Sequence, residues 1–333
     1  MLLFYCFKNF ILNPRKSGGG GNMNAKYSIV IPAYNEQESI PLFIEAVTPI
    51  MQNLNEEYEV IFVNDGSRDN TLNVLKNFAN KDRHIKYVSF ARNFGQQAAI
   101  FCGLAHSSGD AVIIMDVDLQ DPVEVIPLMI EKWKDGYEIV HGKRTKRNGE
   151  NFFKKFTSAM YLKFLQSISG LKIPKNVGEF KLLDRKVVDV INAMPEHERF
   201  LRGLTSWVGF KQTEVEFERK ARKAGETKYT LKKMLKYAGN GIVSYSTWPL
   251  TLAMKSGLLF GFLSVACFIT FIVLACCKIF LPLTAWLFPT VALFFSWMLI
   301  ITGFNNIYLR RTYEETRNRP RYIISETKNF EKN

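Results

Sequence analysis

The N-terminal half of the chain alternates short apolar runs with longer stretches of helical periodicity, from Tyr27 to His141. This alternation is typical of βα units, in which helices connect parallel strands. The strand-like runs are apolar without interruption, as expected for strands covered on both faces. The sequence therefore predicts an α/β fold with a doubly wound, mostly parallel sheet. We expect strands at Tyr27–Ala33, Glu59–Asn64, Ile85–Phe90, Ala111–Asp116 and Glu138–Gly142, and helices near 37–53, 69–80, 95–107 and 122–135.

The C-terminal third has a different composition. Charged residues make up 23% of the chain, yet Lys278 is the only one between Ser256 and Leu309. The two apolar stretches on either side of it, at about 254–277 and 284–307, are each long enough for a helix to cross a bilayer, which needs about 20 residues. They predict two C-terminal transmembrane helices. Basic residues flank both, so we expect an integral protein of the cytoplasmic membrane with its α/β domain and both termini on the cytoplasmic side.

The net charge of +13 indicates work against an anionic surface, either lipid or nucleic acid. The predicted spans favour lipid, and we expect no nucleic acid partner. The cysteines show no metal-ligand spacing, which argues against a zinc site or a disulfide framework. The histidines show no ligand spacing either and are interpreted as structural or surface residues.

These patterns divide the chain into five parts. Residues 1–25 form an extension, which fits a leader, a flexible segment or a wrongly chosen start codon. Residues 26–228 form the α/β domain, with one half at about 26–142 and a basic, aromatic half at about 143–228 that includes strand-like alternation at 214–218. An amphipathic helix at 229–250 suits either a membrane interface or a protein core. The predicted spans occupy 251–309 and a basic tail occupies 310–333.

The strongest chemical signal is Asp116-Val117-Asp118-Leu119-Gln120, at the end of the fourth predicted strand. Ligands of open α/β sheets bind at the carboxyl ends of strands, and residues two apart on a strand point the same way. Two carboxylates can therefore converge there. Such a pair suits Mg²⁺ or Mn²⁺, which bind carboxylate and phosphate oxygens.

Two further motifs follow the first and second predicted strands. They are Ile31-Pro32-Ala33-Tyr34-Asn35-Glu36 and Val63-Asn64-Asp65-Gly66-Ser67-Arg68-Asp69. Both lie where a nucleotide binds in such folds. For the second motif, a turn followed by Asp69 or Asn70 as a helix N-cap is the alternative.

Together with Arg92-Asn93-Phe94-Gly95, these motifs resemble the family 2 glycosyltransferases of the GT-A fold. The segments at 178–185, 198–203 and 222–229 narrow the resemblance to the polyprenyl-phosphate glycosyltransferases, over about residues 26–312. The resemblance implies an inverting enzyme that moves a hexose from a nucleotide diphosphate sugar to a polyprenyl phosphate for modification of cell-envelope glycans. UDP-glucose and undecaprenyl phosphate are the first expectation, and GDP-mannose is the alternative. It also implies a homo-oligomer, possibly a tetramer.

The resemblance also implies roles for individual residues. The catalytic candidates are Asp118 and Glu179. The metal, Mg²⁺ or Mn²⁺, would be bound by Asp116, Asp118 and Gln120. The nucleotide sugar would contact Pro32, Tyr34, Glu36, Asp65, Arg92, Asp116 and Gln120. The acceptor phosphate would contact Arg144, Lys155, Ser158, Arg199, Arg202 and Arg222, since guanidinium groups match phosphate geometry.

One segment departs from the family pattern. Relatives usually have Gly-Asp-Phe-Arg-Leu-Leu-Asp-Arg, where this chain has Glu179 and Lys181. The first Asp is often proposed as a base. A lipid monophosphate is already largely ionised near neutral pH, because the second pKa of a phosphomonoester is about 6. Glu179 is therefore interpreted either as a base or as a group that orients acceptor or sugar.

Two rival interpretations stay open. A processive polysaccharide synthase would share the nucleotide-sugar domain, but this sequence has no Gln-x-x-Arg-Trp segment. A binding scaffold without turnover is the second rival, and the two carboxylates near 116–118 argue against it.

Overall fold

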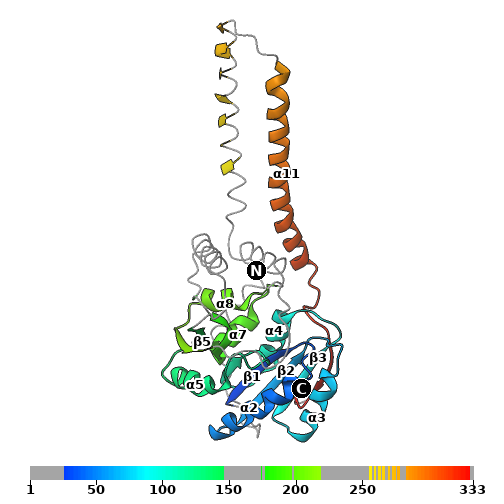
Figure 1. Ribbon diagram of the computed structural model, residues 1–333, viewed down its shortest axis with the longest axis vertical. Helices are drawn as coiled ribbons and strands as arrows, with labels where there is room; N and C mark the ends of the chain where they lie inside the picture. Colours follow the sequence, from blue (N-terminus) through cyan, green and yellow to red (C-terminus); the bar gives the residue numbers. More distant parts are fainter. Residues whose placement is uncertain are drawn as a thin grey trace, which may run out of the picture.

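The computed structural model describes residues 26–145, 174, 177–196, 199–218 and 283–330, with scattered residues between 255 and 277. Within this part, a twisted sheet lies between two layers of helices, and one long helix projects away from it (Figure 1). The predicted extension at 1–25 and the amphipathic helix at 229–250 lie outside the described residues.

The described strands form one sheet with the order β7-β5-β6-β4-β1-β2-β3-β8. Its centre is parallel: β1 pairs with β2 and β4, and β2 pairs with β3. The strands β1, β2 and β4 are fully or almost fully buried, which explains their continuously apolar sequences. The bounds are β1 Tyr27–Ala33, β2 Tyr58–Asn64, β3 Ile85–Phe90 and β4 Ala111–Ile114.

Three of the outer strand pairs are antiparallel. β6 runs antiparallel to β4 and β5, and β8 runs antiparallel to β3, while β5 and β7 are parallel. The bounds are β5 Ile139–Arg144, β6 Val177–Asp184, β7 Gln212–Phe217 and β8 Ile324–Lys328. The predicted α/β architecture with a mostly parallel sheet is confirmed.

Helices cover both faces of the sheet. One face packs against α2 (Ser39–Asn53), α3 (Thr71–Lys81) and α5 (Ile126–Lys134), the last preceded by the short helix η1 (Val123–Val125). The other face packs against α4 (Gln96–His106), α7 (Arg185–Ala193) and α8 (Leu201–Trp207). The sheet therefore separates two apolar layers, and only the strand ends and their loops are open to ligands.

The carboxyl end of β4 differs from the prediction. We expected the strand to reach Asp116, but it ends at Ile114 and Asp116 lies in the following loop. The loop includes left-handed backbone at Leu119, with φ 54°. The predicted metal motif therefore lies in a loop and not on the strand itself.

The prediction of an integral protein with two spans is wrong for the part of the chain that can be checked. Among the described residues, no helix combines the length and the apolar character needed to cross a membrane. The helix α11 (Leu283–Thr316) runs beyond the predicted end of the second span and takes in Arg310, Glu314 and Glu315. Much of the first predicted span lies outside the described residues.

The segment predicted as a basic tail folds back onto the domain. After α11 the chain returns to the sheet, where β8 extends the edge beside β3 (Figure 1). The Tyr322 ring stacks on Phe90 at 4.9 Å, and the Arg321 guanidinium donates to the carbonyl of Pro195 at 2.6 Å. Residues 317–330, which include β8 and which we call the return strand, therefore join the end of α11 to both halves of the domain.

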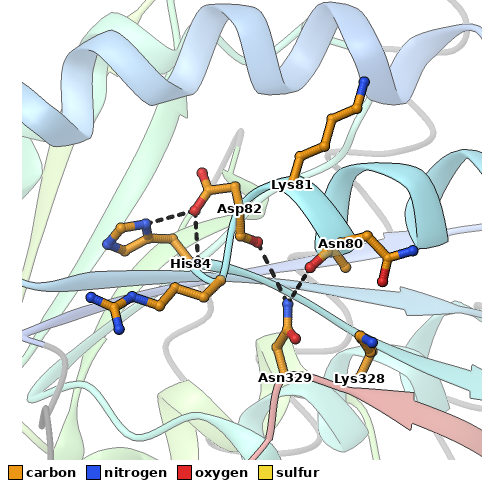
Figure 2. A pocket seen from close by; sticks show the side chains of 8 residues that line it. Asn80, Lys81, Asp82, His84, Lys328 and Asn329 are labelled. Carbon is orange, nitrogen blue, oxygen red and sulfur yellow. Dashed lines mark hydrogen bonds and ion pairs between the residues drawn. The ribbon is translucent and has the colours of Figure 1, made fainter.

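A surface hollow of about 580 Å³ lies where α3 ends and β8 finishes. Figure 2 shows Asn329 reaching into this region. Its amide donates to the carbonyls of Ala79 at 2.7 Å and Ile85 at 2.8 Å. His84 and Asp82 form a local pair at 2.7 Å beside it. This hollow is at the amino end of β3, and the predicted site residues follow the carboxyl ends of the strands. We interpret it as the seam that fastens the return strand.

Candidate active site

The loops that follow β1, β2 and β4 meet at one edge of the sheet, because these strands are parallel neighbours. Hydrogen bonds join the first two loops. The backbone N–H of Asn35 donates to Ser67 Oγ at 2.9 Å, and the N–H of Arg68 donates to Asn35 Oδ1 at 2.8 Å. The predicted nucleotide motifs are therefore one connected structure.

Asp65 ties these loops to the loop that follows β3. Its carboxylate accepts from the backbone N–H groups of Phe94 at 2.6 Å and Gly95 at 2.9 Å. Burial raises the pKa of Asp65, although these two hydrogen bonds and Arg92 oppose the rise. Gly66 follows in left-handed backbone, and a Cβ there would lie 2.3 Å from the Arg92 carbonyl carbon. The motif thus needs glycine so that the two loops can touch.

The other predicted nucleoside residues lie around this junction. Glu36 accepts from Ser39 Oγ at 2.7 Å, and its own N–H donates to Thr71 Oγ1. Pro32 and Tyr34 are partly buried at the end of β1. The Arg92 guanidinium lies over the Phe94 ring at 4.1 Å. The structure brings these residues to one edge of the sheet, and their contacts with a nucleoside stay a prediction.

Acidic side chains gather beyond the end of β4. Burial raises the pKa of Asp116, the negative charges of Asp121, Asp118 and Glu179 raise it as well, and Arg144 opposes them; the combined result is a pKa of about 7. The Gln96 amide donates to Asp116 Oδ1 at 2.9 Å, and Asp118 Oδ1 accepts from the N–H of Gln120 at 3.2 Å. Such clustering of negative charge on a loop with left-handed backbone is typical of a site that binds a cation.

The donor set fits Mg²⁺ or Mn²⁺. Among the described residues, no three acidic, histidine or cysteine side chains form a complete metal cage. A magnesium site needs no such cage, since it typically combines one or two carboxylates with substrate phosphates. The carboxylates of Asp116 and Asp118 supply that pair. The Gln120 Oε1 atom is buried without a hydrogen-bond partner among the described residues, and it is a third oxygen of suitable type.

Arg144, one of the predicted acceptor residues, contacts this cluster. Its Nη2 lies 3.3 Å from Asp121 Oδ1, and Asp121 is almost fully buried. Gly178 leaves room for it, because a Cβ there would lie 2.9 Å from Arg144 Nη2. Arg144 therefore lies between the acidic loop and β6.

The buried carboxylate of Glu179 forms an ion pair with the partly exposed Arg202 beside the acidic loop. Arg202 Nε lies 2.9 Å from Glu179 Oε1, and Glu179 is 6% exposed. Burial alone would raise the pKa of Glu179, but Arg202, Lys181 and Gln97 together lower it below its ordinary value. Glu179 is thus a carboxylate of low basicity in this structure.

The remaining acceptor candidates differ in placement. The guanidinium of Arg199 donates to the backbone carbonyls of Asn192, Met194 and Glu196, and burial lowers its pKa to about 10. It links α7 to α8 and has no contact with the acidic loop among the described interactions. Lys155, Ser158 and Arg222 lie outside the described residues.

Three residues of the site were missed by sequence reasoning. Gln96 follows the Arg-Asn-Phe-Gly motif directly, and Asp121 follows Gln120 directly, so proximity to a motif was the available signal. Lys181 was noted only as a departure from the family pattern. Nothing in its local sequence shows that its ammonium group is fully buried.

Comparison with known proteins gives a consistent result. The family model for glycosyl transferase family 2 matches residues 28–191. An uncharacterised glycosyltransferase of Bacillus subtilis strain 168, YkcC, is 44% identical over 92% of this chain and 95% of its own length. A prophage bactoprenol glucosyl transferase homologue of Escherichia coli K12 is 40% identical over 91% of this chain and 99% of its own length. The bactoprenol glucosyl transferase of Shigella phage SfX is 39% identical over 91% of this chain and its own full length.

Proposed function

This chain belongs to glycosyltransferase family 2, and from that membership we propose that it transfers glucose from a nucleotide diphosphate donor to a polyprenyl phosphate. The observation that carries the proposal is the group of acidic side chains beyond β4, where Asp116 has a pKa of about 7. A divalent cation would relieve this repulsion and would in turn attract a donor diphosphate. The lipid acceptor and the glucose are taken from the bactoprenol glucosyl transferases that align along nine tenths of the chain.

The donor diphosphate is proposed to bind beside Asp116, Asp118 and Gln120. When bound there, Mg²⁺ or Mn²⁺ would neutralise the charge that develops on the departing nucleoside diphosphate. The nucleoside is proposed to lie over the loops that follow β1 and β2, near Tyr34 and Asp65. This assignment is supported by the hydrogen bonds that hold these loops as one surface at the strand ends.

The acceptor is proposed to reach the sugar from the side of Arg144 and Arg202. Both guanidinium groups already pair with carboxylates of the site, Asp121 and Glu179, so each is fixed near the reacting groups. A phosphate oxygen would attack the anomeric carbon as its bond to the diphosphate breaks. The nucleoside diphosphate would leave with the bonding electrons, and the configuration would invert.

No strong base is needed in this proposal, because the acceptor phosphate is ionised near neutral pH. The low basicity of Glu179 is in keeping with that. Its role is proposed to be orientation. The rate would come from positioning and from fixed charge around the diphosphate.

A panel of nucleotide sugars tests the proposal. Purified protein is incubated with Mn²⁺, a short polyprenyl phosphate and, in turn, UDP-glucose, UDP-galactose and GDP-mannose, and lipid products are identified by mass. We expect a polyprenyl-phosphate hexose from UDP-glucose. A product from GDP-mannose alone would replace the donor assignment. Nucleotide sugar binding without any lipid product would favour the scaffold.

A further inference from the structure

Glu179 and Lys181 lie two residues apart on β6, so their side chains emerge on the same side of the sheet. Lys181 pairs with Ile114 of β4 and with His141 of β5, in the middle of the sheet. Both side chains are buried, Glu179 at 6% exposure and Lys181 at 0%. Lys181 is therefore one step deeper in the sheet than Glu179, beneath the acidic loop.

Burial of the Lys181 ammonium group is energetically unfavourable. Its Nζ has no hydrogen-bond partner among the described residues. Burying an unpartnered cation is unfavourable, and the shift of the Lys181 pKa to about 8, caused chiefly by burial, shows the same penalty. An apolar side chain would suit the neighbourhood, since Ile114 and Leu183 are buried next to this position. Packing alone therefore gives no reason for a lysine.

Charge balance with Glu179 gives a reason. Arg202 is already paired with Glu179 Oε1, but it is 37% exposed and can be screened by solvent. Glu179 Oε2 is buried without a hydrogen-bond partner among the described residues. Lys181 is the unscreened cation on the protein side of this carboxylate. It helps to keep Glu179 charged in spite of burial, and the Glu179 charge in turn reaches Asp116.

Resting on the function proposed above, we propose that Lys181 is a positioning residue that acts through Glu179. Its buried ammonium, on the same side of β6, keeps the Glu179 carboxylate charged in spite of burial, so that this carboxylate accepts a hydrogen bond from a hydroxyl of the transferred sugar. A carboxylate that nearby cations keep ionised is a poor base and a good hydrogen-bond acceptor. Glu179 thereby contributes to sugar recognition, and Lys181 contributes without touching the sugar.

A double-mutant cycle tests this. The variants are Lys181→Met, Glu179→Gln and the double variant, since methionine matches the length of lysine without its charge. The matched control is Lys186→Met, which removes an exposed lysine of α7. Transfer from UDP-glucose to polyprenyl phosphate gives kcat and KM, and UDP binding reports that each variant is folded.

We expect Lys181→Met to lower kcat about tenfold in the wild-type background and by less than about twofold in the Glu179→Gln background, as for residues that act as one unit. Lys186→Met should match wild type, and Lys181→Arg should restore most of the rate. The proposal would be overturned if Lys181→Met lowered kcat by the same factor in the wild-type and Glu179→Gln backgrounds. It would also be overturned if Lys181→Met had the wild-type rate. If Lys181→Met fails to bind UDP, Lys181→Gln takes its place in the cycle. Absence of product with wild-type protein would instead count against the proposed function.

Discussion

The Gln96 amide nitrogen lies 2.9 Å from Asp116 Oδ1, which joins the first turn of α4 to the loop beyond β4. The contact links two residues that are twenty positions apart in the chain. It also supplies a neutral donor to a carboxylate whose pKa is raised by the nearby charges of Asp121, Asp118 and Glu179. Gln96 therefore helps to fix the carboxylate that we assign to the cation.

Substituting Gln96 tests that contact. Gln96→Ala should lower kcat by roughly tenfold and weaken Mn²⁺ activation. Removing a hydrogen-bond partner of a metal-binding group typically lowers activity or metal affinity by about that factor. Gln52→Ala, at the exposed end of α2, is the control and should behave as wild type. The measurement is the initial rate of transfer against Mn²⁺ concentration. An unchanged metal dependence in Gln96→Ala would contradict the role given to this hydrogen bond.

The raised pKa of Asp116 predicts a pH-dependent stability. Its pKa is about 7 in the folded, metal-free protein against an ordinary value of 3.8. Ionising it therefore opposes folding: stability falls as the pH rises from about 4 to 7, and the penalty is complete above about 7. Asp116→Asn removes this penalty. Its Tm advantage, about 2–4 °C for each kcal/mol, should be present at pH 8 and absent at pH 4.

Thermal unfolding of both proteins in a chelator, at several pH values, makes that measurement. Added Mn²⁺ should raise the Tm of wild type more than that of the variant. Equal Tm values for the two proteins at pH 8 without metal would show that ionised Asp116 does not destabilise the folded protein.

Gly66 and Gly136 provide a matched pair of glycines. Both have left-handed backbone, with φ 63° and 87°, so alanine is strained at either position. Only at Gly66 would the new Cβ meet backbone, 2.3 Å from the Arg92 carbonyl carbon, while Gly136 has open space around it. Gly136→Ala should cost about 1 kcal/mol. Gly66→Ala should cost clearly more and should weaken UDP binding, as measured by calorimetry. Equal effects would contradict the close approach of the two loops.

The return strand should contribute to stability. Tyr322→Ala removes a ring stacked on Phe90 and should lower the free energy of unfolding by about 2 kcal/mol. Tyr313→Ala, an exposed tyrosine of α11, should change it little. Chemical denaturation followed by circular dichroism compares the two. If both substitutions changed the free energy of unfolding only slightly, the return strand, which leads into β8, would not be part of the cooperative domain.

The central strands could be predicted from sequence because burial on both faces leaves an unbroken apolar run. β1 and β3 have the predicted bounds. β6 was not predicted as a strand, since Glu179 and Lys181 look like solvent-facing residues when only their neighbours are seen. β8 was missed because Ile324–Lys328 is short and mostly exposed, and it forms only by pairing with β3 far away in sequence.

The site could be predicted to the level of its motifs. Position after the apolar run at 111–114 marked Asp116 and Asp118, and the structure gathers acids there. The contacts between motifs depend on tertiary structure, and Gln96, Asp121 and Lys181 acquire their partners only through it. The prediction of two spans depended on the length of two apolar stretches and on the distribution of charge, and no helix of the described residues supports it.

Metal-dependent release of UDP tests the central claim most directly. Wild-type protein and Asp118→Asn are stripped with a chelator and given UDP-glucose, with and without polyprenyl phosphate and Mn²⁺. The account predicts that wild type releases one UDP for each lipid-linked glucose, only when lipid and ion are both present, and that Asp118→Asn is slower by roughly 100-fold. The account would be contradicted if wild type transferred glucose at equal rates with the ion and with the chelator, or if Asp118→Asn were as active as wild type.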